Sequence, residues 1–212
     1  FFEKEKLRPF LIYMGIILIT YCFLRFGMAH VFFNKHGLTP ISTMDLTHRL
    51  INIPMIVMTY LGTFFWPANL VTSQQWAVKS VTIWPAFFNL TFLSILGILG
   101  YLIYRKKRKF FKLWLFFLVW FLAALSFHLQ IFPLDLTVSD RWFYLTLAGL
   151  SGLLVVSIWP FKITKWMVWI SVCLLFILSL RTIIREFDWH DGLTLYSHDM
   201  KNSQNSFDLE NN

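Results

Sequence analysis

A neighbouring acid and base close the loop 133–141, directly before an aromatic run that begins at Trp142. The planar guanidinium of Arg141 could bind a phosphate group through paired hydrogen bonds, with Asp140 orienting it and Tyr144 nearby. The alternative interpretation is an interfacial anchor, in which Arg141 extends toward water and Asp140 caps the following helix. Asp140, Arg141 and Tyr144 are therefore the first candidates for a phosphate site.

A second group of polar residues occupies the segment 29–49 and consists of His30, Lys35, His36, Asp45, His48 and Arg49. Cationic groups at a membrane surface suit an anion such as phosphate, so His48 and Arg49 join the candidates. Asp45 could act as a base or a metal ligand. The alternative is a solvated loop. The histidines lack a third ligand at a useful spacing, so no metal site is expected through histidine.

Arg25 lies within the apolar segment 10–28, where a charged side chain is costly and marks a functional site by default. It is also close enough to the end of the segment to extend into the interface. Both interpretations stay open, and Arg25 completes the set of candidate phosphate ligands. His128, inside the apolar segment 113–132, is interpreted as an ordinary helix residue.

The segments that carry these residues have the composition of membrane helices. Of the 212 residues, 57% are hydrophobic and 14% are charged, whereas soluble domains contain about 25% charged residues. Six apolar segments are of a length that suits a hydrocarbon layer of about 30 Å. They cover residues 10–28, 50–66, 83–104, 113–132, 142–159 and 166–184. The sequence predicts an all-α integral membrane protein with five to six transmembrane helices and a short helical soluble tail.

The basic residues predict the orientation of this bundle. The densest block, residues 105–112, is placed on the cytoplasmic side, as are Lys162 and Lys165. Six crossings would put the basic residues of the N-terminus outside. The segment 50–66 is the shortest and contains polar residues and a proline, so it is predicted to be re-entrant or interfacial. Five crossings then remain, with the tail extracytoplasmic, and six crossings are the alternative.

The predicted bundle covers residues 1–184, and the predicted helical tail covers residues 185–212. His190, Asp191 and His198 in that tail are interpreted as part of a soluble helix rather than a catalytic cluster. The formal charge of +8 does not indicate nucleic-acid binding, because the basic residues lie between apolar segments. No cofactor motif is evident, although a divalent cation could be bound. The sequence starts at Phe1 without a signal peptide, so a fragment of a longer protein is expected.

Four stretches together match the pattern of a known family. Arg25 closes one helix, and Thr47-His48-Arg49-Leu50 opens another that ends in Trp66-Pro67-Ala68-Asn69-Leu70. Ser139-Asp140-Arg141-Trp142-Phe143-Tyr144-Leu145 forms the third, and Arg181-Thr182, Arg185, Trp189, Asp191 and Thr194-Leu195-Tyr196 form the fourth. This order resembles the C-terminal half of GT-C superfamily membrane glycosyltransferases with tetratricopeptide repeats, such as the cadherin-directed O-mannosyltransferases and their bacterial relatives. Thr146 departs from the proline that is common in the third stretch.

The resemblance implies a transferase that moves sugar from a polyprenyl-phosphate-linked donor to a protein acceptor on the extracytoplasmic face. The catalytic acids of such enzymes lie in an upstream outer loop, so the catalytic residues are unknown here. The present residues would supply part of the groove for the lipid carrier and the link to the repeats, in contact with membrane lipid. A transporter or flippase of lipid-linked saccharides, a scaffold without catalysis and a polysaccharide polymerase or ligase are the alternatives.

Overall fold

The computed structural model describes residues 4–29, 39–68, 70–80, 82–158 and 164–203, in two compact units that meet at residues 36 and 37. The described part of the first unit is one continuous helix. It begins as the α-helix α1 (Lys4–Cys22) and continues as the π-helix η1 (Phe23–Met28). None of its apolar side chains from Arg8 to Met28 is buried, and most of them are exposed.

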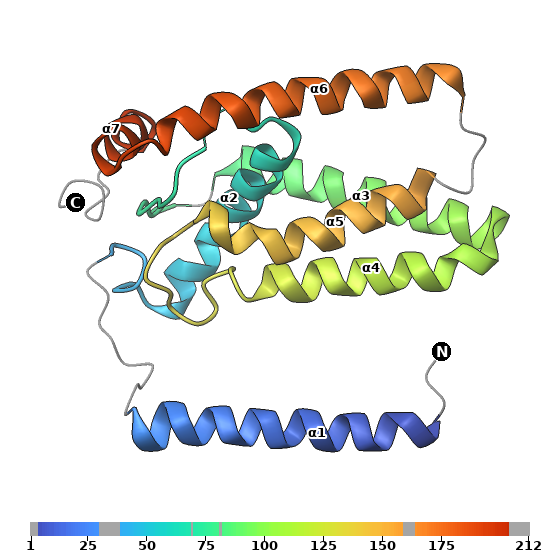
Figure 1. The fold of residues 1–212 in the computed structure, drawn as a ribbon, viewed down its shortest axis with the longest axis horizontal. Coiled ribbons are helices and arrows are strands. Elements are labelled where there is room, and N and C mark those ends of the chain that lie inside the picture. The colour runs from blue at the N-terminus through green and yellow to red at the C-terminus, as the bar shows by residue number, and fades with distance from the viewer. Residues whose placement is uncertain (1–3, 30–38, 69, 81, 159–163, 204–212) are drawn as a thin grey trace. The chain divides into compact units, whose positions relative to one another are not determined.

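The second unit is a set of helices connected by loops (Figure 1). Its elements are α2 (Leu46–Phe65), α3 (Ile83–Lys106), α4 (Arg108–Ser126), the 3-10 turn η2 (Asp140–Trp142), α5 (Phe143–Ile158), α6 (Lys165–Asp188) and α7 (Gly192–Asn202). Within the described residues there is no strand, only an isolated bridge between Gln74 and Val138. The predicted all-helical fold is confirmed.

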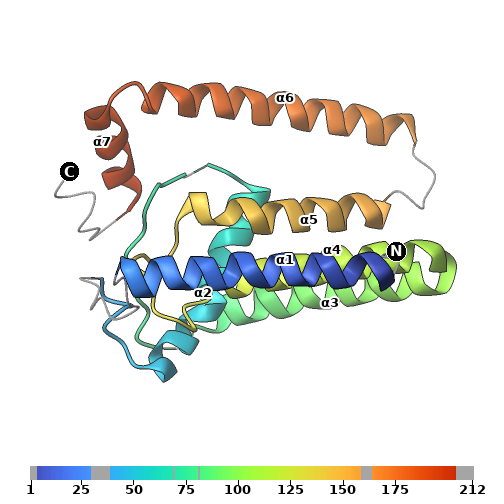
Figure 2. The same ribbon diagram turned by 60° about the horizontal axis from the view of Figure 1, so that its bottom comes forward.

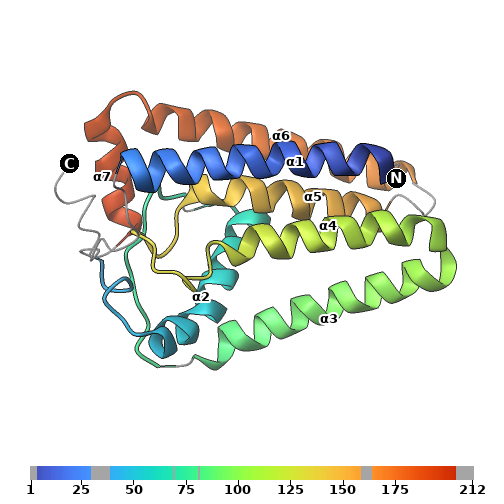
Figure 3. The same cartoon turned by 90° about the horizontal axis from the view of Figure 1, so that it is seen from below.

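Five helices are long and apolar enough to cross a membrane: Arg8–Met28, Ile83–Lys106, Arg108–Ser126, Asp140–Ile158 and Lys165–Asp188. They correspond to five of the six predicted segments. The segment 50–66 forms α2, which is absent from this set and lies at an angle to the long helices α3, α4 and α5 (Figures 1 and 3). The five candidate spans thus exclude α2, and the re-entrant or interfacial position of this helix stays a prediction.

The long helices of the second unit alternate in direction, which gives the unit two chemically different ends (Figure 3). One end contains the α3–α4 turn at residues 105–112 and the start of α6 at Lys165, and is called the basic end. The other end contains residues 39–52, 66–68, 70–80, 127–142 and 181–203, and is called the polar end. Lys162, which was predicted to lie with the basic residues, falls outside the described residues.

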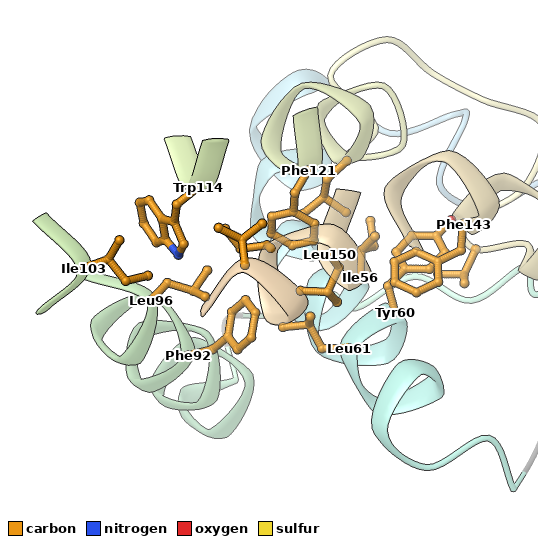
Figure 4. Packing of buried hydrophobic residues seen from close by; sticks show 14 of the residues in the cluster. Ile56, Tyr60, Leu61, Phe92, Leu96, Ile103, Trp114, Phe121, Phe143 and Leu150 are labelled. Carbon is orange, nitrogen blue, oxygen red and sulfur yellow. The ribbon is translucent and has the colours of Figure 1, made fainter. Parts of the chain in front are cut away.

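Close packing of α4 against α5 forms the centre of the second unit. A Cβ atom on Gly149 would lie 2.8 Å from the backbone nitrogen of Phe121, and one on Gly152 would lie 2.3 Å from the ring of Phe117. Glycine at these positions lets the two helices approach closely. The rings and aliphatic side chains around this contact pack together in the core (Figure 4). They include Ile56, Tyr60, Leu61, Phe92, Leu96, Trp114, Phe121, Phe143 and Leu150.

Several helix boundaries differ from the predicted segments, and the ends of α4 and α6 bear most on the polar end. The segment 113–132 was expected to be helical to its end, but α4 stops at Ser126. Gln130 is fully buried with φ 60, and its Nε2 donates to the carbonyl of Leu136 at 2.6 Å while its Oε1 accepts from Leu134 N at 3.1 Å. These bonds fold the chain back in place of a final helical turn. At the other boundary, α6 continues to Asp188, beyond the predicted end at residue 184.

Candidate functional site

The framework of the polar end is a short pairing between two extended stretches. Gln74 N donates to Val138 O at 3.0 Å, and Thr137 N donates to Gln74 O at 2.9 Å. The hydroxyl of Thr137 donates to the carbonyl of Trp76. These bonds hold residues 136–139 against residues 74–76, although the two stretches lie far apart in the sequence.

Asn52 attaches this framework to α2. Its amide nitrogen donates to Val78 O at 3.0 Å and to His48 O at 2.8 Å, and its amide oxygen accepts from Val78 N at 2.6 Å. The side chain is fully buried. A buried amide with its polar groups satisfied in this way fixes one geometry, because any shift would leave a donor or acceptor without a partner.

Two arginines join α6 to its neighbours at the polar end, one to residues 67 and 68 and the other to α7. Arg181 and Arg185 are one helical turn apart and therefore lie on one face of α6. Arg181 donates from Nε to Pro67 O at 2.8 Å and from Nη2 to Ala68 O at 2.6 Å. Arg185 is the one buried residue of α6. None of the apolar side chains of this helix is buried. The contact of α6 with the framework is thus made by cations rather than by its apolar face.

Arg185 lies at the centre of an ionic cluster with α7. Its guanidinium donates to Asp199 Oδ1 at 3.0 Å and to Asp188 Oδ2 at 3.2 Å, and it contacts His198 Nδ1 at 2.9 Å. Asp199 has a fully buried side chain, and its other oxygen accepts from Thr72 N at 2.8 Å and from Thr72 Oγ1 at 2.7 Å. Figure 2 shows the resulting sharp turn between α6 and α7.

The ionised form of Asp199 is favoured in this cluster. Burial raises the pKa of the carboxyl, but the hydrogen bonds from Thr72 and His198 and the charge of Arg185 outweigh it, so the pKa lies below its usual value. The buried carboxylate stabilises the docked position of α7 as long as both Arg185 and Thr72 are present. Removal of either partner would leave a buried acceptor without its hydrogen bond.

Asp140 reaches the edge of this cluster. It is partly buried at the start of η2 and accepts a hydrogen bond from the backbone nitrogen of Val71. The charges of Arg185 and Asp199 both act on it, with opposite sign. Asp140 is therefore held by residues 71 and 72 and their neighbours, and Ser139 rather than Asp140 is the N-cap residue of η2.

Arg141 and Tyr144, which follow Asp140, are exposed. No hydrogen bond or ion pair to another described residue occupies the guanidinium of Arg141. Arg141 precedes Leu145 by four residues, so the two share one face of the chain at the start of α5. The cation is thus available to a ligand at the polar end.

An apolar groove runs along α4, and one of its lining residues, Leu145, follows Arg141 by four positions. It is lined by Phe116, Val119, Trp120, Ala123, Ala124 and Phe127, with Leu145 of α5 on its other side. Trp120 Nε1 donates to Leu145 O at 3.1 Å, which joins the two walls. From Phe116 to Phe127 the groove follows α4 for roughly 16 Å, at 1.5 Å for each residue. Its lining contains no charged side chain.

His48 and Arg49 lie in the first turn of α2 and form a separate group. His48 contacts the carboxylate of Asp45, and this hydrogen bond lowers the pKa of Asp45. Arg49 is partly buried, and its Nε has no hydrogen-bond partner among the described residues. Among the described residues, no hydrogen bond or ion pair joins His48 or Arg49 to Arg141.

Arg25 belongs to the first unit, in η1, where its Nη1 donates to the hydroxyl of Tyr21 at 2.8 Å. The guanidinium also lies over the rings of Tyr21 and Phe26. These local contacts place the guanidinium against aromatic side chains of its own helix. Such an arrangement is compatible with an arginine that extends along the helix toward the interface. His30, Lys35 and His36 fall outside the described residues.

The remaining histidines have local explanations. His128 lies beyond the end of α4 and stacks on Trp142 with ring centroids 5.6 Å apart, and burial lowers its pKa. Asp191 caps α7 by accepting from Thr194 N at 2.7 Å, with His190 beside it. Among the described residues, no group of three or more His, Cys, Asp or Glu side chains could hold a metal ion.

Sequence reasoning missed the central part of this cluster. Asp199 and Thr72 were not candidates, and Arg185 entered only through the family pattern. The local signal was the pair of arginines one turn apart at the end of an apolar helix, since both would project from the same face. No local signal marked Thr72, which lies 127 positions from Asp199.

No protein-family model matches the chain, and neither a curated protein nor a solved structure matches it.

Proposed function

We propose that this chain binds the lipid carrier in a membrane glycosyltransferase that moves sugar from a polyprenyl-phosphate donor to a protein acceptor. The observation that carries the proposal is the exposed Arg141, which lies four residues before Leu145 in the lining of the apolar groove along α4. A lipid-linked phosphate has the matching chemistry, because its isoprenoid chain is apolar and its phosphate is anionic.

The two parts of the donor would occupy different parts of this surface. The isoprenoid chain would lie against the groove residues from Phe116 to Phe127, facing the bilayer. The phosphate would accept hydrogen bonds from Arg141, with the hydroxyl of Tyr144 one turn of chain away. Asp140 would keep its bond to Val71 and would orient the Arg141 backbone rather than touch the phosphate.

The charge distribution supports an extracytoplasmic position for this site. Basic residues concentrate at 105–112 and at Lys165, on the end opposite to Arg141. Lysine and arginine are enriched in cytoplasmic loops, so the polar end would face outward together with α7. The tail that follows α7 would then meet the protein acceptor.

Arg141 would contribute binding and electrostatic stabilisation rather than acid or base chemistry. When sugar transfer breaks the bond between the anomeric carbon and the phosphate oxygen, negative charge grows on the departing phosphate. A fixed guanidinium stabilises that charge. The base that activates the acceptor would come from an upstream loop outside these residues, as the family resemblance implies.

The test uses the full-length protein in lipid nanodiscs, with sugar release from a polyprenyl-phosphate donor and the donor affinity measured in parallel. Loss of a hydrogen bond to a charged group costs about 1.5–3 kcal/mol, so Arg141→Ala is expected to weaken donor binding about 10- to 100-fold. The matched control is Arg108→Ala at the basic end, which is expected to leave the affinity unchanged.

If Arg141→Ala leaves the donor affinity unchanged, Arg141 is an interfacial anchor and the polar end does not bind the donor phosphate through it. A scaffold without catalysis is the second candidate, favoured by the firm docking of α7 through Asp199. It predicts that the intact protein releases no sugar, while Arg185→Ala abolishes binding of the partner protein.

A further inference from the structure

We propose that Asp199 of α7 is a positioning residue for the donor-binding loop, and that it acts through Thr72 and Val71 on Asp140 and Arg141. The inference rests on the proposed function, since it assigns to α7 a part in binding the same lipid-linked phosphate. Asp199 itself touches no donor atom in this arrangement.

The first step of the connection is the pair of hydrogen bonds that Asp199 accepts from Thr72. One carboxylate oxygen accepts from both Thr72 N and Thr72 Oγ1, at 2.8 and 2.7 Å. The other oxygen accepts from Arg185 at 3.0 Å. Because the side chain is fully buried, water does not replace either partner while α7 is docked.

The second step leads from Thr72 to the residues in front of Arg141. Ser139 Oγ donates to Thr72 O at 2.8 Å, and the backbone nitrogen of Val71 donates to Asp140. Two successive residues on one stretch thus hold two successive residues on the other. Displacement of Thr72 would therefore shift the backbone that carries Arg141.

The third step is electrostatic. The charge of Arg185 acts on Asp199, Asp188 and Asp140. Loss of the Asp199 charge would therefore change the electrostatic environment of Asp140, because the charges of Asp199 and Arg185 both act on it with opposite sign.

As a consequence, the docking of α7 and the position of the donor-binding loop depend on each other. α7 is the first element after the last long helix, and its only buried carboxylate among the described residues is Asp199. Docking of α7 would order the Arg141 loop, and its release would loosen that loop and weaken donor binding.

The test compares two isosteric variants of the full-length protein in nanodiscs, with donor affinity as the readout. Asp199→Asn removes the charge and one of the two acceptor oxygens, so the amide can no longer accept from both Thr72 and Arg185, and it is expected to weaken binding of the polyprenyl-phosphate donor about tenfold. Asp188→Asn is the matched control, because it removes a carboxylate from the same arginine without a bond to Thr72. It is expected to change the affinity less than twofold.

The coupling to Arg141 separates positioning from general stability. In the Arg141→Ala background, Asp199→Asn is expected to have no further effect on donor affinity, because the group that it positions is gone. Additive losses, or an unchanged affinity in Asp199→Asn when Arg141→Ala is impaired, would overturn the inference.

Amide hydrogen exchange provides the structural readout. Asp199→Asn is expected to speed exchange at Thr72 and in residues 139–141, and unchanged exchange there would overturn the link. If Asp199→Asn fails to fold, Ser139→Ala breaks the same connection at its other end and is expected to weaken donor binding. If Arg141→Ala alone leaves donor binding intact, the proposed function fails, while the exchange data still decide whether α7 positions the loop.

Discussion

The polar and basic ends of the second unit are both rich in charge, but they use it differently. At the basic end, Arg105 Nη1 donates to the hydroxyl of Tyr101 at 2.9 Å, and Arg108 lies 5.3 Å from the ring centre of Tyr104. These contacts stay within about one helical turn. At the polar end, Asp199 reaches Thr72 across 127 positions of sequence.

The difference shows which charges define a specific geometry. Exposed cations over neighbouring tyrosines can move without leaving a buried group unpaired, so they contribute charge but little order. The buried groups at the polar end, Asn52, Gln130 and Asp199, lose a required partner on any displacement. A binding site needs such pre-organisation, which is why the proposed site lies at that end.

The largest expected effect comes from Arg185→Ala. Removal of the guanidinium leaves Asp199 buried without its ion-pair partner, which costs about 3–5 kcal/mol for a pair of this kind. We expect α7 to detach and the free energy of unfolding to fall by that amount. Unfolding in detergent mixtures and protease cleavage near residue 189 measure the two consequences. Equal stability of Arg185→Ala and the unmodified protein would contradict the ionic docking of α7.

Gln130→Ala tests the loop that replaces the last turn of α4. The change removes the bonds to Leu134 and Leu136 and leaves buried backbone groups unsatisfied, at a cost of about 1–3 kcal/mol. Gln130→Gly has the same losses but tolerates φ 60, so it separates the hydrogen bonds from the backbone conformation. Thermal unfolding of both variants should show losses for each, with the smaller loss for glycine.

Acidification is expected to release α7 at the polar end and to leave the basic end unchanged. The pKa of Asp199 is lower in the folded protein than its ordinary value of 3.8, so its ionised form stabilises docking above about pH 4. That contribution is lost as the pH falls further, through the folded pKa. Arg185 and His198 face the carboxylate as cations or donors, and Asp188 shares Arg185 with it.

The fluorescence of Trp189, which lies next to Arg185, reports this step. It should change below pH 4 in a background where other tryptophans are replaced by phenylalanine. The same change in Asp199→Asn would assign the titration to another group.

The smallest expected effect belongs to the basic end. Arg105→Gln together with Arg108→Gln should change the free energy of unfolding by less than about 1 kcal/mol, since exposed charges contribute little to stability. Thermal unfolding checks this. A loss comparable to that of Arg185→Ala would remove the contrast between the two ends.

Several elements were predictable because their signal is local. The five candidate spans follow from runs of apolar residues, and the distinct character of the segment 50–66 follows from its polar residues and proline. The end of α4 was not predictable in the same way. Ile131 and Phe132 extend the apolar run, yet the buried amide of Gln130 folds the chain back, and its partners belong to residues that come later.

The candidate site shows the same division. Asp140, Arg141 and Tyr144 were found together because they are neighbours in sequence, whereas the bonds of Asp140 and Ser139 to residues 71 and 72 could not be read from neighbouring residues. The predicted phosphate contacts of these residues remain predictions.

The sequence by itself determined which segments are apolar helices and where the basic residues concentrate, because hydrophobicity and charge are properties of short stretches. Only the tertiary structure decided that Arg185, Asp199 and Thr72 form the junction at the polar end. Burial removes water from these groups, so each must find its partner within the folded chain, and that partner can come from any position.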